Sequence, residues 1–161
     1  MIISIPKETS HNETRVAATP QSIKELIKAG YKVKIQTGAG SKSFISDAAY
    51  KEVGANIIED NADIYKESDI IIKVAPPTIE EISLISKNSI LISFFQPTID
   101  LKSVRAMTDS SITGISMHLV PRTTLAQKMD ALSSQANIAG YKAVLMGSAH
   151  MSVYMLSLIH I

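Results

Sequence analysis

Two nearly continuous apolar runs constrain the fold of this chain more than any other feature. Ile70–Val74 and Ser89–Phe95 are apolar or small almost throughout, and each ends at a proline-containing segment. Runs of this length and composition are typical of strands buried on both faces of a parallel sheet. Helices must therefore cover both faces of that sheet.

Shorter strand and helix patterns alternate along the rest of the chain. The further predicted strands are 2–5, 31–36, 56–58 and 112–115, and the predicted helices are 20–29, 47–53, 79–85 and 101–107. With right-handed crossovers, this alternation predicts an α/β fold with a doubly wound, mostly parallel sheet and helices on both faces. No break occurs from Leu125 to about Ala149, so a long C-terminal helix is expected there.

The fold expected is flavodoxin-like or Rossmann-like, but it lacks a glycine fingerprint. Gly38-Ala39-Gly40 follows a predicted strand without the third glycine and the immediate helix that a dinucleotide-binding turn needs. The sequence contains 16 Lys and Arg against 15 Asp and Glu, which argues against a nucleic-acid partner. It has no cysteine, and its histidines lack spaced ligand partners, so no metal site is expected.

Two segments carry a specific resemblance. The first runs from Pro6-Lys7-Glu8 through Arg15-Val16 to Thr19-Pro20, and the second runs from Val120-Pro121-Arg122 to Ala143-Val144. Both are similar to motifs of the alanine dehydrogenase/pyridine nucleotide transhydrogenase family, and the second resembles the transhydrogenase loop and helix that close over the nicotinamide of NAD(H). The matches lie in order and reach to about His150.

The resemblance implies a function for a longer protein. That function is the α subunit of a proton-translocating NAD(P) transhydrogenase, an oxidoreductase and translocase that transfers hydride from NADH to NADP⁺. NAD(H) would bind at this domain and NADP(H) on a partner domain of the β subunit. The resemblance further implies a homodimer of the nucleotide domain and a peripheral location on the cytoplasmic face of the inner membrane.

One position separates the two enzymes of the family. Alanine dehydrogenases place a catalytic His just after the strand that here ends at Phe95, and this chain has Gln96 there. An amide does not titrate in the working range, so it cannot serve as the acid–base group of an amino-acid dehydrogenase. Gln96 favours the transhydrogenase. An alanine dehydrogenase-like oxidoreductase and a non-catalytic stand-alone α/β module remain the alternatives.

The resemblance places four cofactor-binding residues in the second segment. Arg122 offers a fork of donors, while Gln127, Asp130 and Ser133 share one helix face if the helix begins by Ala126. Together they could hold the nicotinamide carboxamide and ribose, while the cofactor supplies the chemistry. From the residues alone, a solvated helix face with an N-terminal cap is the competing interpretation. No catalytic residue is assigned.

A second set consists of Arg15, Lys73 and Gln96, with structural or anion-binding roles expected. In the dehydrogenase relatives the residues matching Arg15 and Lys73 bind a substrate carboxylate. A structural ion pair with Glu8 or Glu13 is at least as compatible with this sequence.

The domain organisation expected is an N-terminal subdomain at 1–124, a connecting helix at 125–150 and a non-native or truncated tail at 151–161. Family members continue into a Rossmann subdomain that this chain lacks, so the chain by itself is expected to be inactive and to bind NADH weakly. The apolar stretch Ala143–Ile161 contains two His, a Gly and three Ser. It is therefore read as a helix face that packs on the missing subdomain, with no membrane span in this fragment.

Overall fold

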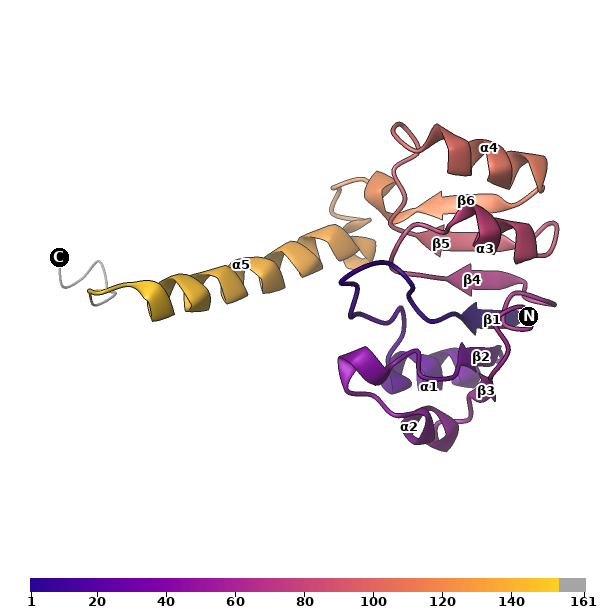
Figure 1. Ribbon diagram of the computed structural model, residues 1–161, viewed down its shortest axis with the longest axis horizontal. Coiled ribbons are helices and arrows are strands. Elements are labelled where there is room, and N and C mark those ends of the chain that lie inside the picture. Colours follow the sequence, from indigo (N-terminus) through magenta and orange to yellow (C-terminus); the bar gives the residue numbers. More distant parts are fainter. Residues whose placement is uncertain (154–161) are drawn as a thin grey trace. The chain divides into compact units, whose positions relative to one another are not determined.

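The computed structural model describes residues 1–153, and the chain divides into two compact units, Met1–His118 and Leu119–Ile161. The first unit contains a six-stranded sheet in which all paired strands are parallel (Figure 1). Its strands are β1 (Ile2–Ile5), β2 (Lys32–Gln36), β3 (Asn56–Ile58), β4 (Ile70–Ile72), β5 (Ile90–Ser93) and β6 (Thr113–Ser116). Their order, β3-β2-β1-β4-β5-β6, is that of a doubly wound fold, so the predicted fold class is confirmed.

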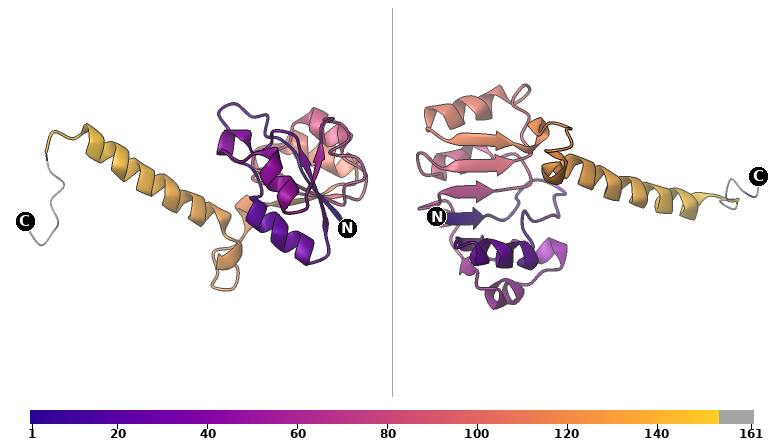
Figure 2. Two further views of the ribbon diagram at one scale, coloured as in Figure 1. Left: turned by 90° about the horizontal axis from the view of Figure 1, so that it is seen from below. Right: turned by 180° about the vertical axis from the view of Figure 1, so that it is seen from behind.

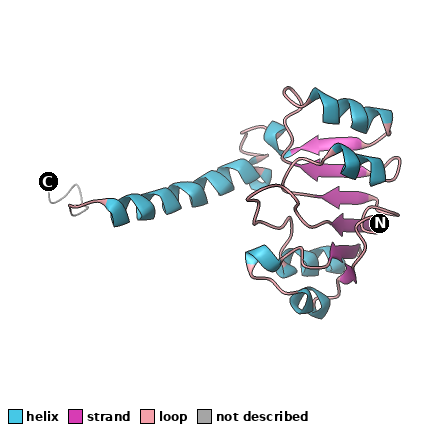
Figure 3. Ribbon diagram, in the orientation of Figure 1, coloured by secondary structure: helices cyan, strands magenta, loops and turns pink. Residues whose placement is uncertain are grey.

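Four helices connect these strands: α1 (Pro20–Lys28), α2 (Asp47–Glu52), α3 (Ile79–Leu84) and α4 (Leu101–Asp109). The chain reverses its direction across the sheet between β3 and β4. Right-handed crossovers then put α1 and α2 on one face and α3 and α4 on the other (Figures 2 and 3).

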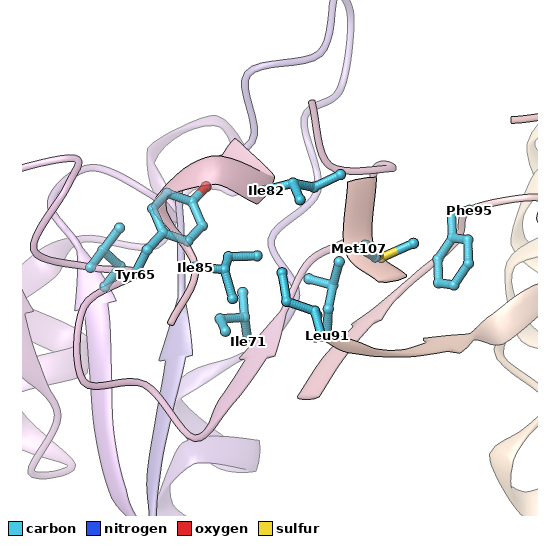
Figure 4. Close-up of a cluster of buried hydrophobic side chains, with 9 residues drawn as sticks. Tyr65, Ile71, Ile82, Ile85, Leu91, Phe95 and Met107 are labelled. Carbon is cyan, nitrogen blue, oxygen red and sulfur yellow. The ribbon is translucent and has the colours of Figure 1, made fainter. Parts of the chain in front are cut away.

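Each face of the sheet has its own apolar core. Ile5, Ile23, Ile35 and Tyr50 centre the core beneath α1 and α2. The opposite core contains Ile64, Tyr65, Ile71, Ile82, Ile85, Leu91, Phe95, Met107 and Ile112 (Figure 4). Aliphatic burial on both faces is what the two apolar runs of the sequence required, since each strand residue faces one helix layer or the other.

Local signals at the helix ends agree with the sequence in most places. The Thr19 side chain caps α1 just before Pro20, and Gly30 follows the helix with a φ of 91°, a conformation that glycine adopts without strain. Thr78 and Glu81 form a capping box at α3. Ser46 caps α2, since its side chain accepts the Ala49 amide.

The second unit contains the 3₁₀ turn η3 (Gln127–Met129) and the helix α5 (Ala131–His150). The predicted long helix is present, but it begins at Ala131 rather than Leu125, because Asp130 caps it after a separate turn. The units divide after His118, six residues before the boundary expected from the sequence. Residues 154–161 of the predicted tail lie outside the described residues. Within 1–153, no helix is long and apolar enough to cross a membrane.

Candidate nucleotide site

A cavity of about 260 Å³ lies within the second unit, and we call it the loop pocket. Its lining residues are Arg122, Thr123, Thr124, Gln127, Asp130 and Ser133. All four residues predicted as cofactor ligands therefore line one cavity. Thr123 and Thr124 were not singled out in the sequence, although their place directly after Arg122 was the available signal.

The geometry that brings these residues together differs from the shared helix face expected. Gln127 opens the 3₁₀ turn η3, Asp130 precedes α5, and only Ser133 belongs to the helix. The turn is held by Thr123, whose carbonyl accepts the Gln127 amide at 2.9 Å and whose hydroxyl accepts the Ala126 amide at 3.4 Å. The chain thus folds back on itself before α5, and this fold creates the cavity.

Asp130 is the most shielded member of the loop pocket. The residue as a whole is 7% exposed. One carboxylate oxygen accepts the Ser133 amide at 3.0 Å and the other accepts the Ser133 hydroxyl at 2.5 Å. The Ser133 hydroxyl, then its amide, and the charge of Arg122 together lower the pKa of Asp130.

Arg122 and Gln127, by contrast, are exposed to solvent. Their side chains offer a charged fork of N–H donors and an amide that both donates and accepts. With Ser133, the loop pocket can hydrogen-bond a planar amide or a hydroxyl-rich sugar. Among its lining residues Asp130 alone has a carboxylate, and the pKa of that carboxylate is lowered, so the pocket lacks a group that titrates near neutral pH.

Lys73 lies elsewhere, at the carboxyl end of β4, inside a set of residues that we call the buried ion cluster: Glu8, Tyr65, Lys73 and Glu81. The ammonium of Lys73 is 2.6 Å from Glu81 Oε1 and 3.9 Å from Glu8 Oε2. Tyr65 donates its hydroxyl to Glu81 Oε1 at 3.0 Å. The ion pair expected with Glu8 is present. Glu81, which also forms the capping box of α3, was not predicted as a partner of Lys73.

Glu8 connects the first family-like segment to the sheet. Its carboxylate accepts the backbone amides of Val74 at 2.6 Å and Ala75 at 3.2 Å, directly after β4. Burial raises the pKa of Glu8, while the Val74 amide, Lys73 and the Ala75 amide oppose that rise. The loop after β1 is thereby held at the carboxyl edge of the sheet.

Arg15 and Gln96 lie in two other loops of the first unit. The Arg15 guanidinium donates to both carboxylate oxygens of Glu13, at 2.9 and 2.7 Å, so the second expected ion pair is present as well. Gln96 is exposed, and its backbone carbonyl accepts the amides of Ile99 and Asp100 in the turn before α4. Neither residue lines the loop pocket.

The profile of the family "Alanine dehydrogenase/PNT, N-terminal domain" matches residues 4–139 of this chain. The chain belongs to this family. The NAD(P) transhydrogenase subunit alpha of Cereibacter sphaeroides is 41% identical over 145 residues, which are 90% of this chain and 28% of that protein. An alanine dehydrogenase of Methanococcus maripaludis is 32% identical over 151 residues, 94% of this chain and 40% of that protein.

Solved structures lead to the same family. A transhydrogenase from Sinorhizobium meliloti matches with a TM-score of 0.90 and 36% identity, covering 99% of this chain and 48% of that one. An L-alanine dehydrogenase matches with a TM-score of 0.71 and 28% identity, covering 74% of this chain and 33% of that one. This chain thus spans about a quarter to a half of the length of the relatives it matches. The transhydrogenases are the more similar of the two groups, as Gln96 predicted.

Proposed function

We propose that this family member is the N-terminal nucleotide-binding part of an NAD(P) transhydrogenase α subunit and that its loop pocket holds the nicotinamide end of NAD(H). The observation that carries the proposal is the convergence of Arg122, Gln127, Asp130 and Ser133 on one cavity. Greater similarity to transhydrogenase subunits than to alanine dehydrogenases supports it.

The chemistry of the loop pocket fits hydride transfer between two nicotinamides. In that reaction a hydride leaves C4 of NADH and adds to C4 of NADP⁺ with both electrons, so no protein group has to exchange a proton. The pocket residues would bind and orient the carboxamide and ribose, and their contribution is proximity and alignment. The exposed amide of Gln96, where an amino-acid dehydrogenase needs an acid–base group, supports the same reaction.

The proposal extends to the assembly. NADP(H) is bound by the partner domain of the β subunit, two nucleotide domains form a homodimer, and hydride transfer is coupled to proton translocation. This domain then lies on the cytoplasmic face of the inner membrane as a peripheral part of the enzyme. Residues of the longer relatives outside the matched region supply most of the remaining NAD contacts, so residues 1–161 alone bind NADH weakly.

A chimera tests the function. The matching 145 residues of the Cereibacter sphaeroides α subunit are replaced by those of this chain, and hydride transfer from NADH to NADP⁺ is measured in the assembled enzyme. We expect an active chimera in which Arg122→Ala and Gln127→Ala each lower turnover about 10- to 100-fold, more than they weaken NADH binding. Lys102→Ala, on the exposed surface of α4, is the matched control and leaves turnover unchanged.

Three results would contradict the proposal. The first is a chimera that assembles and binds NADPH but transfers no hydride. The second is full turnover in both pocket variants, which would remove the loop pocket from the site. The third is oxidation of alanine with NAD⁺ by the chimera, which would favour the dehydrogenase alternative.

A further inference from the structure

Exposed apolar side chains of the first unit gather at one edge of its sheet. Phe44 is fully exposed in the loop after β2, and Ile99, 76% exposed, lies in the loop after β5. Ile79 and Leu101 are exposed at the first positions of α3 and α4. These four residues, which we call the apolar edge, follow the carboxyl ends of strands, toward which the strand arrows point in Figure 1. At the amino edge of this unit, whose residues are all described, Met1 is the only exposed large apolar residue.

Phe44 has an unfavourable backbone conformation for its residue type. Its φ is 60°, in the left-handed region that bulky side chains rarely adopt and that glycine adopts without strain. The other non-glycine residues with positive φ in the described part of the chain are all polar: Asn12, Glu67, Asn88 and Ser111. Folding alone would therefore favour glycine at position 44, because the exposed Phe44 ring returns no burial for its strain.

The residues on either side of Phe44 hold its ring in the solvent. The Ser43 hydroxyl donates to the Thr14 carbonyl at 2.6 Å, which ties this loop to the loop after β1. Ile45 packs against the core beneath α1 and α2. With both neighbours fixed, little conformational freedom of the backbone is left to lose when a partner contacts Phe44. Exposed aromatic side chains presented in this way are suited to anchor a protein partner.

The proposed reaction requires a protein partner at this domain. Direct hydride transfer needs the two nicotinamides in contact, with the reacting carbons about 3–3.5 Å apart, so the part of the β subunit that bears NADP(H) has to dock. Loops at the carboxyl ends of strands are where doubly wound sheets place their ligands. The chain also leaves β6 at this edge and continues into the unit that contains the loop pocket.

We propose that the NADP(H)-bearing part of the β subunit docks on the apolar edge and that the Phe44 ring is its anchor. This inference rests on the proposed function. The strain at Phe44 is then offset in the complex, where the ring becomes buried. A later segment of the α subunit is the other possible occupant, and the labelling experiment below distinguishes the two.

Phe44→Gly separates the strain at this position from the contact. Glycine relieves the strain, so the urea midpoint of the 161-residue chain should rise. The same change removes the anchor, so the affinity of the chimeric α subunit for the β subunit should fall about tenfold. Ser111→Gly is the matched control, because Ser111 is exposed with a φ of 57° in the turn before β6, at the amino edge. That variant should leave the affinity unchanged. An unchanged affinity in Phe44→Gly would overturn the inference.

Thiol labelling identifies what covers position 44. The chain has no cysteine, so Phe44→Cys introduces the only thiol in this part of the chimera. We expect a maleimide to label position 44 as fast in the chimeric α subunit alone as in the 161-residue chain. Addition of the β subunit should slow the labelling at least about tenfold. Equal protection in the α subunit alone would show that a later segment of the same subunit covers Phe44, and the inference would be wrong.

Failure of this inference is distinguishable from failure of the proposed function. A wild-type chimera that binds the β subunit and protects position 44 but transfers no hydride contradicts the proposed function alone. Normal hydride transfer in Phe44→Gly, with wild-type affinity for the β subunit, contradicts the docking role of Phe44 alone.

Discussion

The buried ion cluster and the loop pocket contain similar residue types in opposite states. In the cluster, Lys73 has a side chain that is 1% exposed and two carboxylates beside it. In the loop pocket, Arg122 is exposed beside a cavity, and the carboxylate of Asp130 in the same pocket accepts the Ser133 hydroxyl. A cation whose partners come from its own fold stabilises that fold, whereas a cation beside an open cavity is available to a ligand.

Lys73→Met tests whether the buried ion cluster stabilises the fold, and it has the largest expected effect. The change leaves the carboxylates of Glu8 and Glu81 buried without their common counter-charge. Removing one partner of a buried pair costs about 3–5 kcal/mol, because the remaining charge is uncompensated. Urea denaturation at neutral pH should show a loss in the free energy of unfolding of that size.

Arg122→Ala is the matched control for that experiment. It removes an exposed cation, and surface changes of this kind usually stay within about 0.5 kcal/mol. A Lys73→Met protein that unfolds at nearly the same urea concentration as Arg122→Ala would show that the cluster is not structural. Lys73 would then have to be reconsidered as a ligand-binding residue.

Two buried tyrosines offer a finer test of the cluster. Tyr65 donates to the carboxylate of Glu81 that pairs with Lys73, and Tyr50 donates to the neutral carbonyl of Ala18 at the same distance of 3.0 Å. Because bonds to charged groups are stronger, Tyr65→Phe should cost about 1.5–3 kcal/mol and Tyr50→Phe about 0.5–1.5 kcal/mol. Chemical denaturation of both variants measures the difference. An equal or larger loss in Tyr50→Phe would contradict the importance assigned to the cluster.

The sequence predicted the fold better than it predicted the site, and the reasons are physical. Buried strands such as Ile70–Ile72 carry their own signal, because apolar composition and burial coincide. The start of α5 carries a weaker signal in the sequence. Residues 125–129 are compatible with a helix by composition. In the structure, the Asp130 cap and the hydrogen bonds of Thr123 place the start of α5 after them.

Contacts between distant segments were the hardest to predict. Glu8 was recognised as a candidate partner of Lys73, but its bonds to the Val74 and Ala75 amides depend on the register of β1 beside β4. Glu81 satisfied a local rule as the N3 residue of a capping box, so nothing in the sequence indicated its second role. One carboxylate serving both a helix end and a buried ammonium becomes visible only in the folded chain.

The smallest expected effect concerns pH and the exposed pair of Glu13 and Arg15. The guanidinium hydrogen bond of Arg15 is the main reason why the pKa of Glu13 lies below its ordinary value of 4.5. A carboxyl with a lowered pKa stabilises the fold above its unfolded pKa, and the contribution is lost as pH falls through the folded value. Because Arg15 is 46% exposed and the pair is screened, we expect less than about 1 kcal/mol.

Glu13→Gln isolates this contribution in unfolding measurements from about pH 6 to pH 3. The wild type should be slightly more stable than Glu13→Gln at the upper end, and the two should converge at the lower end. A difference in stability between wild type and Glu13→Gln that grows on acidification would contradict the stabilising role assigned to Glu13.

The pH dependence linked to Glu8 has the opposite sign, because burial raises the pKa of Glu8. Any stability linked to Glu8 therefore declines as pH rises from 4.5 through the raised value. Solvent exposure of the pair weakens the contribution of Glu13 to stability, while burial in the cluster reverses the pH dependence of the contribution of Glu8. The environment of each carboxylate therefore decides how it affects stability.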